Sequence, residues 1–229
     1  MPRAAISLDP RLEKIAELCG RCSSFADIGT DHGRLGAYML QTGLCERVQF
    51  TDISEPSLMK AKRLLSTLGI ADKARFLVGD GAKALSERAD VAVIAGMGGE
   101  TISGIIARGR EELADARLVL QPNVGAEDVR RQLVESGYAI CDEVVVRDGR
   151  RLYVIIAAEP GSMELTDFQL AVGPVLMEKR PDSLFEYTDF RLRVVRKAIG
   201  ELEKGGHDSA LLRRELVIWQ EVDSWRRQG

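Results

Sequence analysis

Acidic residues and glycines alternate in one short stretch near the amino terminus. The segment Phe25-Ala-Asp-Ile-Gly-Thr-Asp-His-Gly33 carries Asp27, Gly29, Asp31 and Gly33 at every second position. Glycine lets a backbone turn tightly against a ligand, and a carboxylate accepts hydrogen bonds from cationic or hydroxylated groups. In a G-x-G-x-x-G dinucleotide loop a helix N-terminus faces a pyrophosphate, whereas here Asp31 replaces the second glycine with a negative charge. The stretch therefore predicts a site for a positively charged ligand without phosphate, and S-adenosylmethionine has these properties.

Two further predicted strands end beside an acidic residue. A strand over 47–52 ends on Asp52, about 20 residues beyond the glycine loop, where α/β nucleotide folds hold ribose hydroxyls. The alternative for Asp52 is a place in the cap of the helix that starts at Ser54. A strand over 74–78 precedes Gly79-Asp80-Gly81, which is a turn in either interpretation. In the functional interpretation, Asp80 also accepts a hydrogen bond from the exocyclic amine of an adenine.

Glycines and amide side chains follow the next two predicted strands. The apolar run over 91–95 is typical of a central parallel strand and ends in Gly96-Met-Gly-Gly99. This cluster is either a tight strand-to-helix turn or part of a ligand site, because ligands of open α/β sheets bind at the carboxyl ends of the strands. A strand over 118–123 ends in Gln121-Pro-Asn123. The two amides either contact a base edge or cap the helix that begins at Ala126.

Apolar periodicity and turn residues predict the elements that position these strand ends. Asp9-Pro10 supplies an N-cap and a first-turn proline, and Asp148-Gly149 predicts a hairpin between the last two strands. The resulting fold class is α/β, a doubly wound, seven-stranded, mostly parallel sheet with one antiparallel edge strand. We expect helices over 8–18, 35–41, 56–68, 100–107 and 126–136, and strands over 24–28, 47–52, 74–78, 91–95, 118–123, 138–146 and 152–158.

The composition changes after Pro160-Gly161, and the rest of the chain is predicted to be helical. A short apolar helix over 166–177 contains Gly173-Pro174, and two longer helices follow. Apolar residues recur three and four positions apart in both, and a glycine pair separates them. The helices are too short for a long coiled coil, so we expect an antiparallel helical hairpin. The expected domains are a cofactor-binding domain over 1–160 and a C-terminal helical domain over 161–229.

The overall composition is that of an ordinary soluble protein. Of 229 residues, 45% are hydrophobic and 29% charged, with a net charge of −3. No apolar run approaches the roughly 18 residues of a membrane span and the amino terminus lacks a signal-peptide core, so we expect a cytoplasmic protein. Cys19-Gly-Arg-Cys22 lies between a helix and a strand, the reverse of a redox arrangement, and no second pair completes a zinc site. We therefore expect no metal and no membrane partner, and the hairpin slightly favours a monomer.

Basic residues cluster in two places despite the acidic net charge. That net charge argues against a globally basic nucleic-acid binder, so a polyanionic partner would need a local basic patch. Such charges are solvated surface in one interpretation and contacts to phosphate in the other. The clusters comprise Arg191, Arg193, Arg196 and Lys197 in the tail, and Arg130, Arg131, Arg147, Arg150 and Arg151 in the first domain.

Three motifs together resemble the bacterial tRNA (adenine(22)-N1)-methyltransferase family. They are Asp-Ile-Gly-Thr-Asp-His-Gly at 27–33, Ala-Gly-Met-Gly-Gly at 95–99 and Leu-Gln-Pro-Asn at 120–123. Each motif alone is weak, whereas the combination is specific, and the resemblance extends along nearly the whole chain. It implies a class I, Rossmann-like, S-adenosylmethionine-dependent methyltransferase whose appended helices help to hold tRNA. Many enzymes that methylate base nitrogens carry an Asn-Pro-Pro-Tyr type motif after the fourth strand, where this chain has Ala-Gly-Met-Gly.

The resemblance also implies roles for individual residues. Binding of S-adenosylmethionine would involve Asp27, Gly29, Asp31, Gly33, Asp52, Ile53, Gly79, Asp80, Gly81, Ala95, Gly96 and Met97. Contacts to the target base and the tRNA would involve Gly98, Gly99, Gln121, Pro122, Asn123, Arg191, Arg193, Arg196 and Lys197.

Methylation of adenine N1 needs little general acid or base catalysis from the protein. N1 already carries a lone pair, so in-line positioning would supply much of the acceleration. The base is then cationic until N6 loses a proton, and we expect His32 or Asp31 to accept it, with loss to water as the alternative. Because N1 lies on the Watson-Crick edge, the target must be unpaired or extruded first.

Three other functions stay open at this point. The first is a methyltransferase for a small molecule or a protein, because a fold does not determine its substrate. The second is a catalytically silent RNA-binding module with a vestigial pocket, against which the acidic residues Asp27, Asp52 and Asp80 argue. The third is an NAD-dependent dehydrogenase, which Asp31 disfavours.

Overall fold

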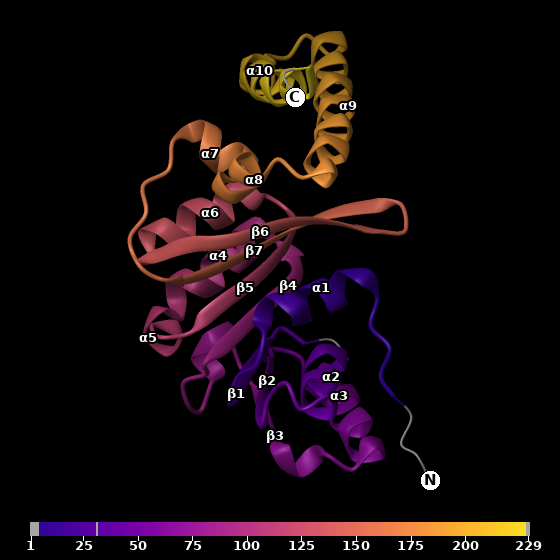
Figure 1. The fold of residues 1–229 in the computed structure, drawn as a ribbon, viewed down its shortest axis with the longest axis vertical. Helices are drawn as coiled ribbons and strands as arrows, with labels where there is room; N and C mark the ends of the chain where they lie inside the picture. The colour runs from indigo at the N-terminus through magenta and orange to yellow at the C-terminus, as the bar shows by residue number, and fades with distance from the viewer. Residues whose placement is uncertain (1–4, 31, 228–229) are drawn as a thin grey trace. The chain divides into compact units, whose positions relative to one another are not determined.

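The chain forms two compact units, Met1–Glu164 and Leu165–Gly229. A computed structural model describes residues 5–30 and 32–227 of the chain, and Figure 1 traces the fold. The first unit contains a β-sheet covered by helices, and the second unit is helical. Within the described ranges, no helix combines the length and the apolar character needed to cross a membrane.

The described residues of the first unit form one seven-stranded sheet with the order β3-β2-β1-β4-β5-β7-β6. Strands β1 to β5 are parallel to one another, and β7 pairs antiparallel with both β5 and β6. The predicted seven-stranded, mostly parallel α/β sheet is therefore confirmed. The strands are β1 (Ser24–Ile28), β2 (Arg47–Asp52), β3 (Ala74–Val78), β4 (Val91–Gly98), β5 (Arg117–Val124), β6 (Tyr138–Asp148) and β7 (Arg151–Pro160).

The position expected for the antiparallel strand was wrong. The antiparallel strand is β7, and it lies between β5 and β6 rather than at the edge. Residues 154–158 of β7 are buried without interruption, whereas burial along β6 rises and falls from residue to residue. A continuously apolar strand is most stable inside a sheet, and an alternating strand suits the edge. The second strand of the hairpin, β7, therefore lies inside the sheet, and the first strand, β6, lies at its edge.

Helices cover both faces of the sheet, as Figure 1 shows. Asp9 caps the first helix by accepting the backbone N–H of Leu12 at 2.8 Å, and Pro10 occupies its first turn, both as predicted. One face carries α1 (Pro10–Cys19), α2 (Arg34–Gln41) and α3 (Glu55–Leu68), and the other carries α4 (Gly99–Arg108) and α6 (Ala126–Glu135). Short elements are α5 (Arg110–Leu113) and the 3-10 turns η1 (Ala71–Lys73) and η2 (Gly81–Ala84).

Strand β4 is longer than its apolar run predicts. It continues through the glycine cluster to Gly98, which pairs with Val124 of β5, and the register shifts on both sides of Met97. Such a bulge re-aims side chains at the end of a strand. The cluster is therefore an irregular strand end rather than a simple strand-to-helix turn.

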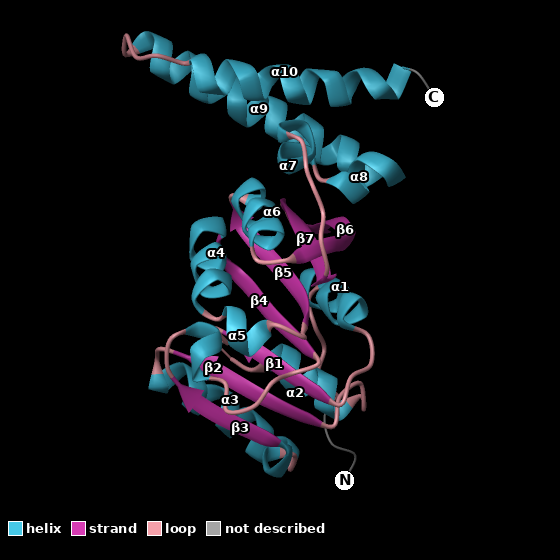
Figure 2. Cartoon of the chain, turned by 90° about the vertical axis from the view of Figure 1, so that its left-hand side faces the viewer, coloured by secondary structure: helices cyan, strands magenta, loops and turns pink. Residues whose placement is uncertain are grey.

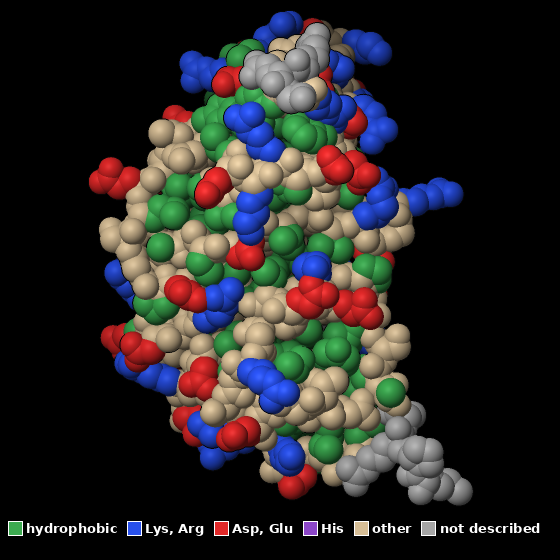
Figure 3. Space-filling view, viewed as in Figure 1, with side chains coloured by type: hydrophobic (Ala, Val, Ile, Leu, Met, Phe, Trp, Pro, Cys, Tyr) green, Lys and Arg blue, Asp and Glu red, His purple; other side chains and the backbone are tan. Residues whose placement is uncertain are grey.

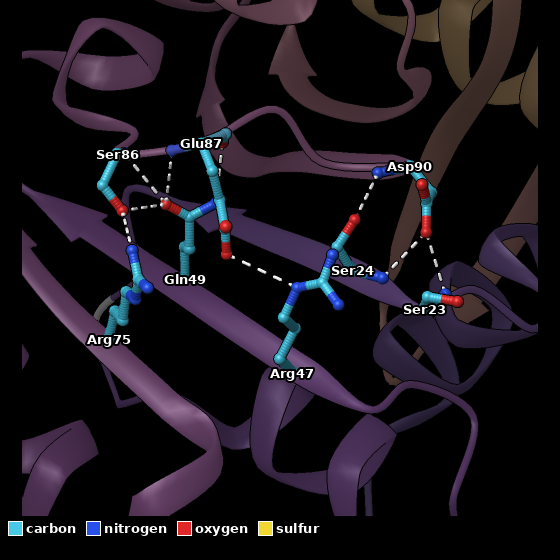
Figure 4. Close-up of polar contacts among 8 residues, drawn as sticks. All are labelled: Ser23, Ser24, Arg47, Gln49, Arg75, Ser86, Glu87 and Asp90. Atoms are coloured by element: carbon cyan, nitrogen blue, oxygen red, sulfur yellow. Dashed lines mark hydrogen bonds and ion pairs between the residues drawn. The ribbon is translucent and has the colours of Figure 1, made fainter.

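Polar side chains tie the amino-terminal ends of the strands to the β3–β4 connection (Figure 4). Gln49 is 2% exposed, and its Oε1 accepts the backbone N–H groups of Ser86 and Glu87 at 2.9 and 3.3 Å. The carboxylate of Asp90 accepts the backbone N–H groups of Ser23 and Ser24 at 2.9 and 2.8 Å. These bonds pair backbone groups that the strand ladders leave open.

A buried ion pair joins α6 to β6. Arg130 donates from Nε to Glu143 at 2.7 Å, and the two side chains are 1% and 0% exposed. The suggestion that Arg130 contacts phosphate was therefore wrong, because this guanidinium lies inside the first unit and is neutralised there. Removing one partner of such a pair leaves an uncompensated buried charge.

The second unit contains a helical hairpin. The single helix predicted over 166–177 is instead divided at Gly173, whose φ is +108° and which precedes Pro174. Proline supplies no backbone N–H, so the helix cannot run through this position. The helices are α7 (Asp167–Val172), α8 (Pro174–Lys179), α9 (Asp182–Lys204), α10 (Ala210–Ser224) and the 3-10 turn η3 (Trp225–Arg227). Helices α9 and α10 run side by side in opposite directions, which confirms the predicted hairpin (Figure 2).

Candidate functional site

A cavity of about 470 Å³ lies at the carboxyl ends of β1 and β4. The chain builds outward from β1 to β3 on one side and from β4 on the other, so these strands flank the topological switch point where open α/β sheets bind ligands. The cavity is lined by Asp9, Arg11, Leu12, Asp27, Gly29, Thr30, His32, Gly33, Arg34, Leu35, Val93, Ala95, Gly96 and Met97. Seven of the residues predicted for the site are among them.

The loop after β1 is held in shape by Thr30. Its hydroxyl donates to Asp27 Oδ2 at 3.2 Å and accepts the backbone N–H of Gly33 at 3.0 Å. The backbone N–H of Gly29 donates to the carbonyl oxygen of Thr51 at 2.7 Å, which ties the loop to β2. Thr30 lies within the predicted motif but was given no role, because its type alone does not distinguish a loop brace from a surface residue.

Asp27 is the buried acid of the cavity, with 8% of its surface exposed. Burial raises the pKa of its carboxyl to about 6, the hydrogen bonds from Thr30 and the Gly36 backbone oppose that rise, and the charge of Asp52 adds to it. The group therefore ionises near pH 6 and is an anion at neutral pH. A buried anion with two long hydrogen bonds, of 3.2 and 3.4 Å, favours a cationic ligand.

Gly29 is needed at its position for two reasons. Its φ is +74°, a conformation that side chains disfavour, and a Cβ atom there would lie 1.8 Å from Met97 Cε. The side chain of Met97 therefore packs directly over the loop from the bulged end of β4. This contact joins two of the predicted motifs across the cavity.

The predicted residues at the tip of β2 lie beside the cavity rather than in its lining. The N-cap of α3 is Ser54 and not Asp52, so the interpretation of Asp52 as the cap of this helix was wrong. Asp52 instead accepts the backbone N–H of the capping residue Ser54 at 2.7 Å. Ile53 is 78% exposed. An apolar side chain this exposed at a strand tip is suited to packing against the flat face of a ligand.

The Gly79-Asp80-Gly81 segment lies at the tip of β3. Asp80 is exposed and accepts two hydrogen bonds from Arg108, at 2.9 Å from Nε and 3.0 Å from Nη2. The bonds from Arg108 lower the pKa of Asp80. Gly81 is buried, and a Cβ atom there would lie 2.9 Å from Ile105. Asp80 therefore presents a carboxylate whose orientation Arg108 sets.

The second glycine cluster divides into an exposed and a buried part. Gly96 is exposed and lines the cavity. Gly99 is buried, and a Cβ atom there would lie 2.1 Å from the carbonyl oxygen of Gly125. Gly99 thus allows the first turn of α4 to approach the loop before α6, and this packing accounts for its residue type.

Gln121, Pro122 and Asn123 lie near the carboxyl end of β5, and of these three only Asn123 is exposed. The alternative that their amides cap the following helix was wrong, because α6 has Gly125 at its N-cap and no side chain bonds there. Asn123 Nδ2 instead donates to the carbonyl oxygen of Gly96 at 2.7 Å, and Gln121 Nε2 donates to Asn123 Oδ1 at 3.2 Å. The two amides therefore connect β5 to the cavity.

Arg11 completes this hydrogen-bond chain. Its Nη1 donates to Gln121 Oε1 at 2.6 Å, and its guanidinium lies 5.5 Å from the ring centroid of Tyr153. Sequence reasoning missed Arg11 because 110 positions separate it from Gln121. No local pattern signals such a contact.

Of the two residues expected to accept a proton, the structure describes only His32. Asp31 lies outside the described residues. His32 is exposed and lines the cavity, so it is positioned at the entrance of the site rather than in its interior.

The basic residues of α9 have unequal surroundings. Arg193, Arg196 and Lys197 are exposed. Arg191 is half-buried between the hairpin helices, where it pairs with Glu215 and lies 5.9 Å from the ring centroid of Trp219. Arg191 therefore stabilises the hairpin. On the face drawn in Figure 3, basic and acidic side chains are intermixed over the first unit.

The cysteines are protonated at neutral pH. Burial raises the pKa of Cys22 to about 11 and that of Cys45 to about 12, and it also raises the pKa of Cys19. Thiols in this state are poor nucleophiles and poor metal ligands. Among the residues that the structure describes, no group of three or more His, Cys, Asp or Glu side chains is placed to hold a metal ion.

Comparisons with known proteins agree with this geometry. A family model described as a methyltransferase domain matches residues 8–156, a range that contains the whole described lining of the cavity. The tRNA (adenine(22)-N(1))-methyltransferase of Bacillus subtilis (strain 168) is 30% identical over 183 residues, which cover 76% of this chain and 77% of that relative.

Solved structures extend the similarity to nearly the full chain. The crystal structure of the B. subtilis m1A22 tRNA methyltransferase is 25% identical with a TM-score of 0.86, covering 95% of this chain and 99% of that chain. A Streptococcus pneumoniae protein, solved in complex with S-adenosyl-L-methionine, is also 25% identical with a TM-score of 0.86, covering 95% and 100%.

Proposed function

We propose that this chain, which belongs to the tRNA (adenine(22)-N(1))-methyltransferase family, transfers a methyl group from S-adenosylmethionine to N1 of adenine 22 in bacterial tRNA. The observation that carries the proposal is the buried Asp27 carboxylate in a cavity at the switch point of the sheet. The motifs around it are those on which the family resemblance depends.

The residues present fit S-adenosylmethionine. A cavity of about 470 Å³ is within the range that holds small-molecule ligands. The anionic form of Asp27 would attract the cationic ammonium and sulfonium groups of the cofactor. The tip of β2 would serve the nucleoside, with Asp52 accepting from the ribose hydroxyls and Ile53 packing against the adenine, and Asp80 would accept from the adenine amine.

The protein's part in the reaction is to place adenine N1 in line with the methyl group. The bound cofactor supplies an electrophilic methyl group. Gly96 and Asn123 would border the target base, and the N6 proton would pass either to His32, at the entrance of the site, or to Asp31. Excluding water and holding the two reacting atoms in contact would provide most of the acceleration.

We assign different binding functions to the two parts of the chain. Residues 1–160 would bind the cofactor and the target base, and residues 161–229 would hold tRNA. Arg193, Arg196 and Lys197 would contact the phosphate backbone, with a binding constant that falls as salt rises. We propose that the protein is cytoplasmic. We also propose that it is a monomer, and light scattering of the purified protein would test its oligomeric state.

Nucleoside mass spectrometry tests the function directly. Purified protein is incubated with S-adenosylmethionine and two transcripts of one tRNA, one with adenine and one with uridine at position 22. We expect 1-methyladenosine in the first transcript only. Equal methylation of both, or incorporation of label into protein alone, would contradict the proposal and favour a different methyl acceptor.

A further inference from the structure

We propose that Arg11 is a positioning residue that orients the amides of Gln121 and Asn123, so that Asn123 presents its carbonyl oxygen to the exocyclic amine of the target adenine. This inference rests on the proposed function. It adds a specificity-determining residue on α1, far in sequence from the motifs that mark the family.

The direction of the hydrogen bonds carries the argument. A guanidinium only donates, so Arg11 Nη1, 2.6 Å from Gln121, requires the oxygen of that amide to face it. The Nε2 group of Gln121 must then point the other way, and it donates to Asn123 Oδ1 at 3.2 Å. The Nδ2 group of Asn123 is left to donate to the carbonyl oxygen of Gly96 at 2.7 Å. One cation thereby sets the orientation of two amides.

Burial separates the roles of the two amides. Gln121 is 0% exposed, so it transmits the orientation and does not reach a base. Asn123 is exposed and bonds to Gly96, which lines the cavity. An amide oxygen accepts two hydrogen bonds, and Gln121 supplies one to Asn123 Oδ1. The second acceptor position of this oxygen is the one available to a base.

An acceptor at this place distinguishes purines by the group attached to C6, the carbon bonded to N1. Adenine carries the N6 amine there and donates a hydrogen bond, whereas hypoxanthine and guanine carry an oxygen. An oxygen facing Asn123 Oδ1 would be repelled and would leave both groups unpaired, which a polar site rejects strongly. The oriented amide would therefore both select adenine and bring N1 toward the cavity.

The main test inverts the chain of hydrogen bonds. In Gln121→Glu, the new carboxylate still accepts from Arg11 and keeps the buried position filled, but it can no longer donate to Asn123. Asn123 must then turn its Nδ2 group toward position 121 and lose the acceptor that faces the base. In Arg11→Met the chain loses the cation that sets its direction, and Arg11→Lys restores a group that only donates.

The readout is the ratio of two binding constants, measured with S-adenosylhomocysteine present. The ligands are a tRNA with adenine at position 22 and the same tRNA with inosine there. We expect the wild type to prefer adenine at least tenfold, Gln121→Glu and Arg11→Met to bring the ratio within about twofold of unity, and Arg11→Lys to recover part of it. Cofactor affinity by calorimetry should stay within about threefold for Gln121→Glu.

Arg34→Gln is the matched control. Arg34 also lines the cavity, and its guanidinium donates to the backbone carbonyl of Ser7 rather than to an amide side chain. Its removal changes the charge of the cavity by the same amount, so we expect the ratio to stay at the wild-type value. Circular dichroism establishes that each variant is folded.

Two results would overturn the inference. One is a tenfold or greater loss of cofactor affinity in Arg11→Met with an unchanged ratio, which would make Arg11 a cofactor contact. The other is an unchanged ratio in a folded Gln121→Glu variant. A wild-type protein that methylates no tRNA would instead refute the proposed function, so the two failures are distinguishable.

Discussion

An aspartate carboxylate lies at each end of strand β1, Asp90 from the β3–β4 connection and Asp27 from β1 itself, and the two have opposite surroundings. At the amino end, Asp90 accepts the backbone N–H groups of Ser23 and Ser24 at 2.9 and 2.8 Å, and those bonds lower its pKa. At the carboxyl end, Asp27 has hydrogen bonds of 3.2 and 3.4 Å, and burial raises its pKa to about 6.

The difference shows which acid serves the fold and which serves the ligand. Asp90 is stabilised as an anion by groups of the protein, so its charge contributes to folding. Asp27 is held as an anion at neutral pH with too few donors, and its charge opposes folding until a cation binds. A buried charge that lacks enough hydrogen-bond donors, and whose pKa is therefore shifted, is typical of a functional site.

The largest effect is expected on ligand affinity, from removing the carboxylate of Asp27 at the carboxyl end of β1. Asp27→Ala should weaken S-adenosylmethionine binding by on the order of 100-fold, because a desolvated charge contact is lost. Isothermal titration calorimetry measures the affinity, and Asp90→Asn, which alters an acid at the other end of β1, should bind normally. Wild-type affinity in Asp27→Ala would refute the assignment of the loop.

Neutralising Asp27 should also stabilise the protein. The folded pKa of about 6 lies above the ordinary 3.8, so the folded state loses stability as pH rises from about 4 to about 6. The difference corresponds to about 3 kcal/mol at pH 7, and Asp27→Asn should recover much of it. Urea unfolding of both proteins at pH 4 and pH 7 measures this. A stability difference between the two proteins that is the same at both pH values would contradict the raised pKa.

Gln49→Leu should destabilise the fold at the amino-terminal ends of the strands without changing the affinity for the ligand. The substitution leaves the backbone N–H groups of Ser86 and Glu87 without their acceptor, at a cost of about 2 kcal/mol. We expect a lower urea midpoint and an unchanged affinity for S-adenosylmethionine at 25 °C. Loss of affinity in a folded variant would show that the two ends of the sheet are coupled.

Asp90→Asn is expected to have the smallest effect. The amide keeps one acceptor but loses the charge, which costs about 1 kcal/mol at neutral pH because the site is exposed and solvent screens it. Since the folded pKa of Asp90 is lowered, its contribution is present above pH 4 and is lost as pH falls through the folded pKa. Wild type and variant should therefore converge in acid, which thermal unfolding at pH 7 and pH 2.5 would measure.

Much of the fold could be predicted from local patterns. Strands β1, β2 and β3 have the bounds expected from the sequence, and the cap by Asp9 is the one that its residue type indicates. The place of β7 was missed although the two strands differ locally: the continuous apolar run over 154–158 is typical of an interior strand, whereas β6 alternates and suits the edge.

The candidate site was predictable where its residues are adjacent in the chain. Asp27, Gly29, His32 and Gly33 of the first loop and Met97 of the second glycine cluster were all expected at the site, and all line the cavity. The roles of Gly99 and Arg130 were not predictable, because each depends on a contact with another element: the backbone at Gly125 and the carboxylate of Glu143.

The sequence by itself determined the class of fold, the order of its elements and the alternation of acids and glycines that predicts a cationic ligand. These features depend on periodicity and residue type, which act over a few neighbouring positions. Only the tertiary structure decided that Asp27 is buried and that Arg11 donates a hydrogen bond to Gln121, 110 positions away. Burial and long-range hydrogen bonds arise from packing between elements, and they set both the charge of a carboxylate and the direction of an amide.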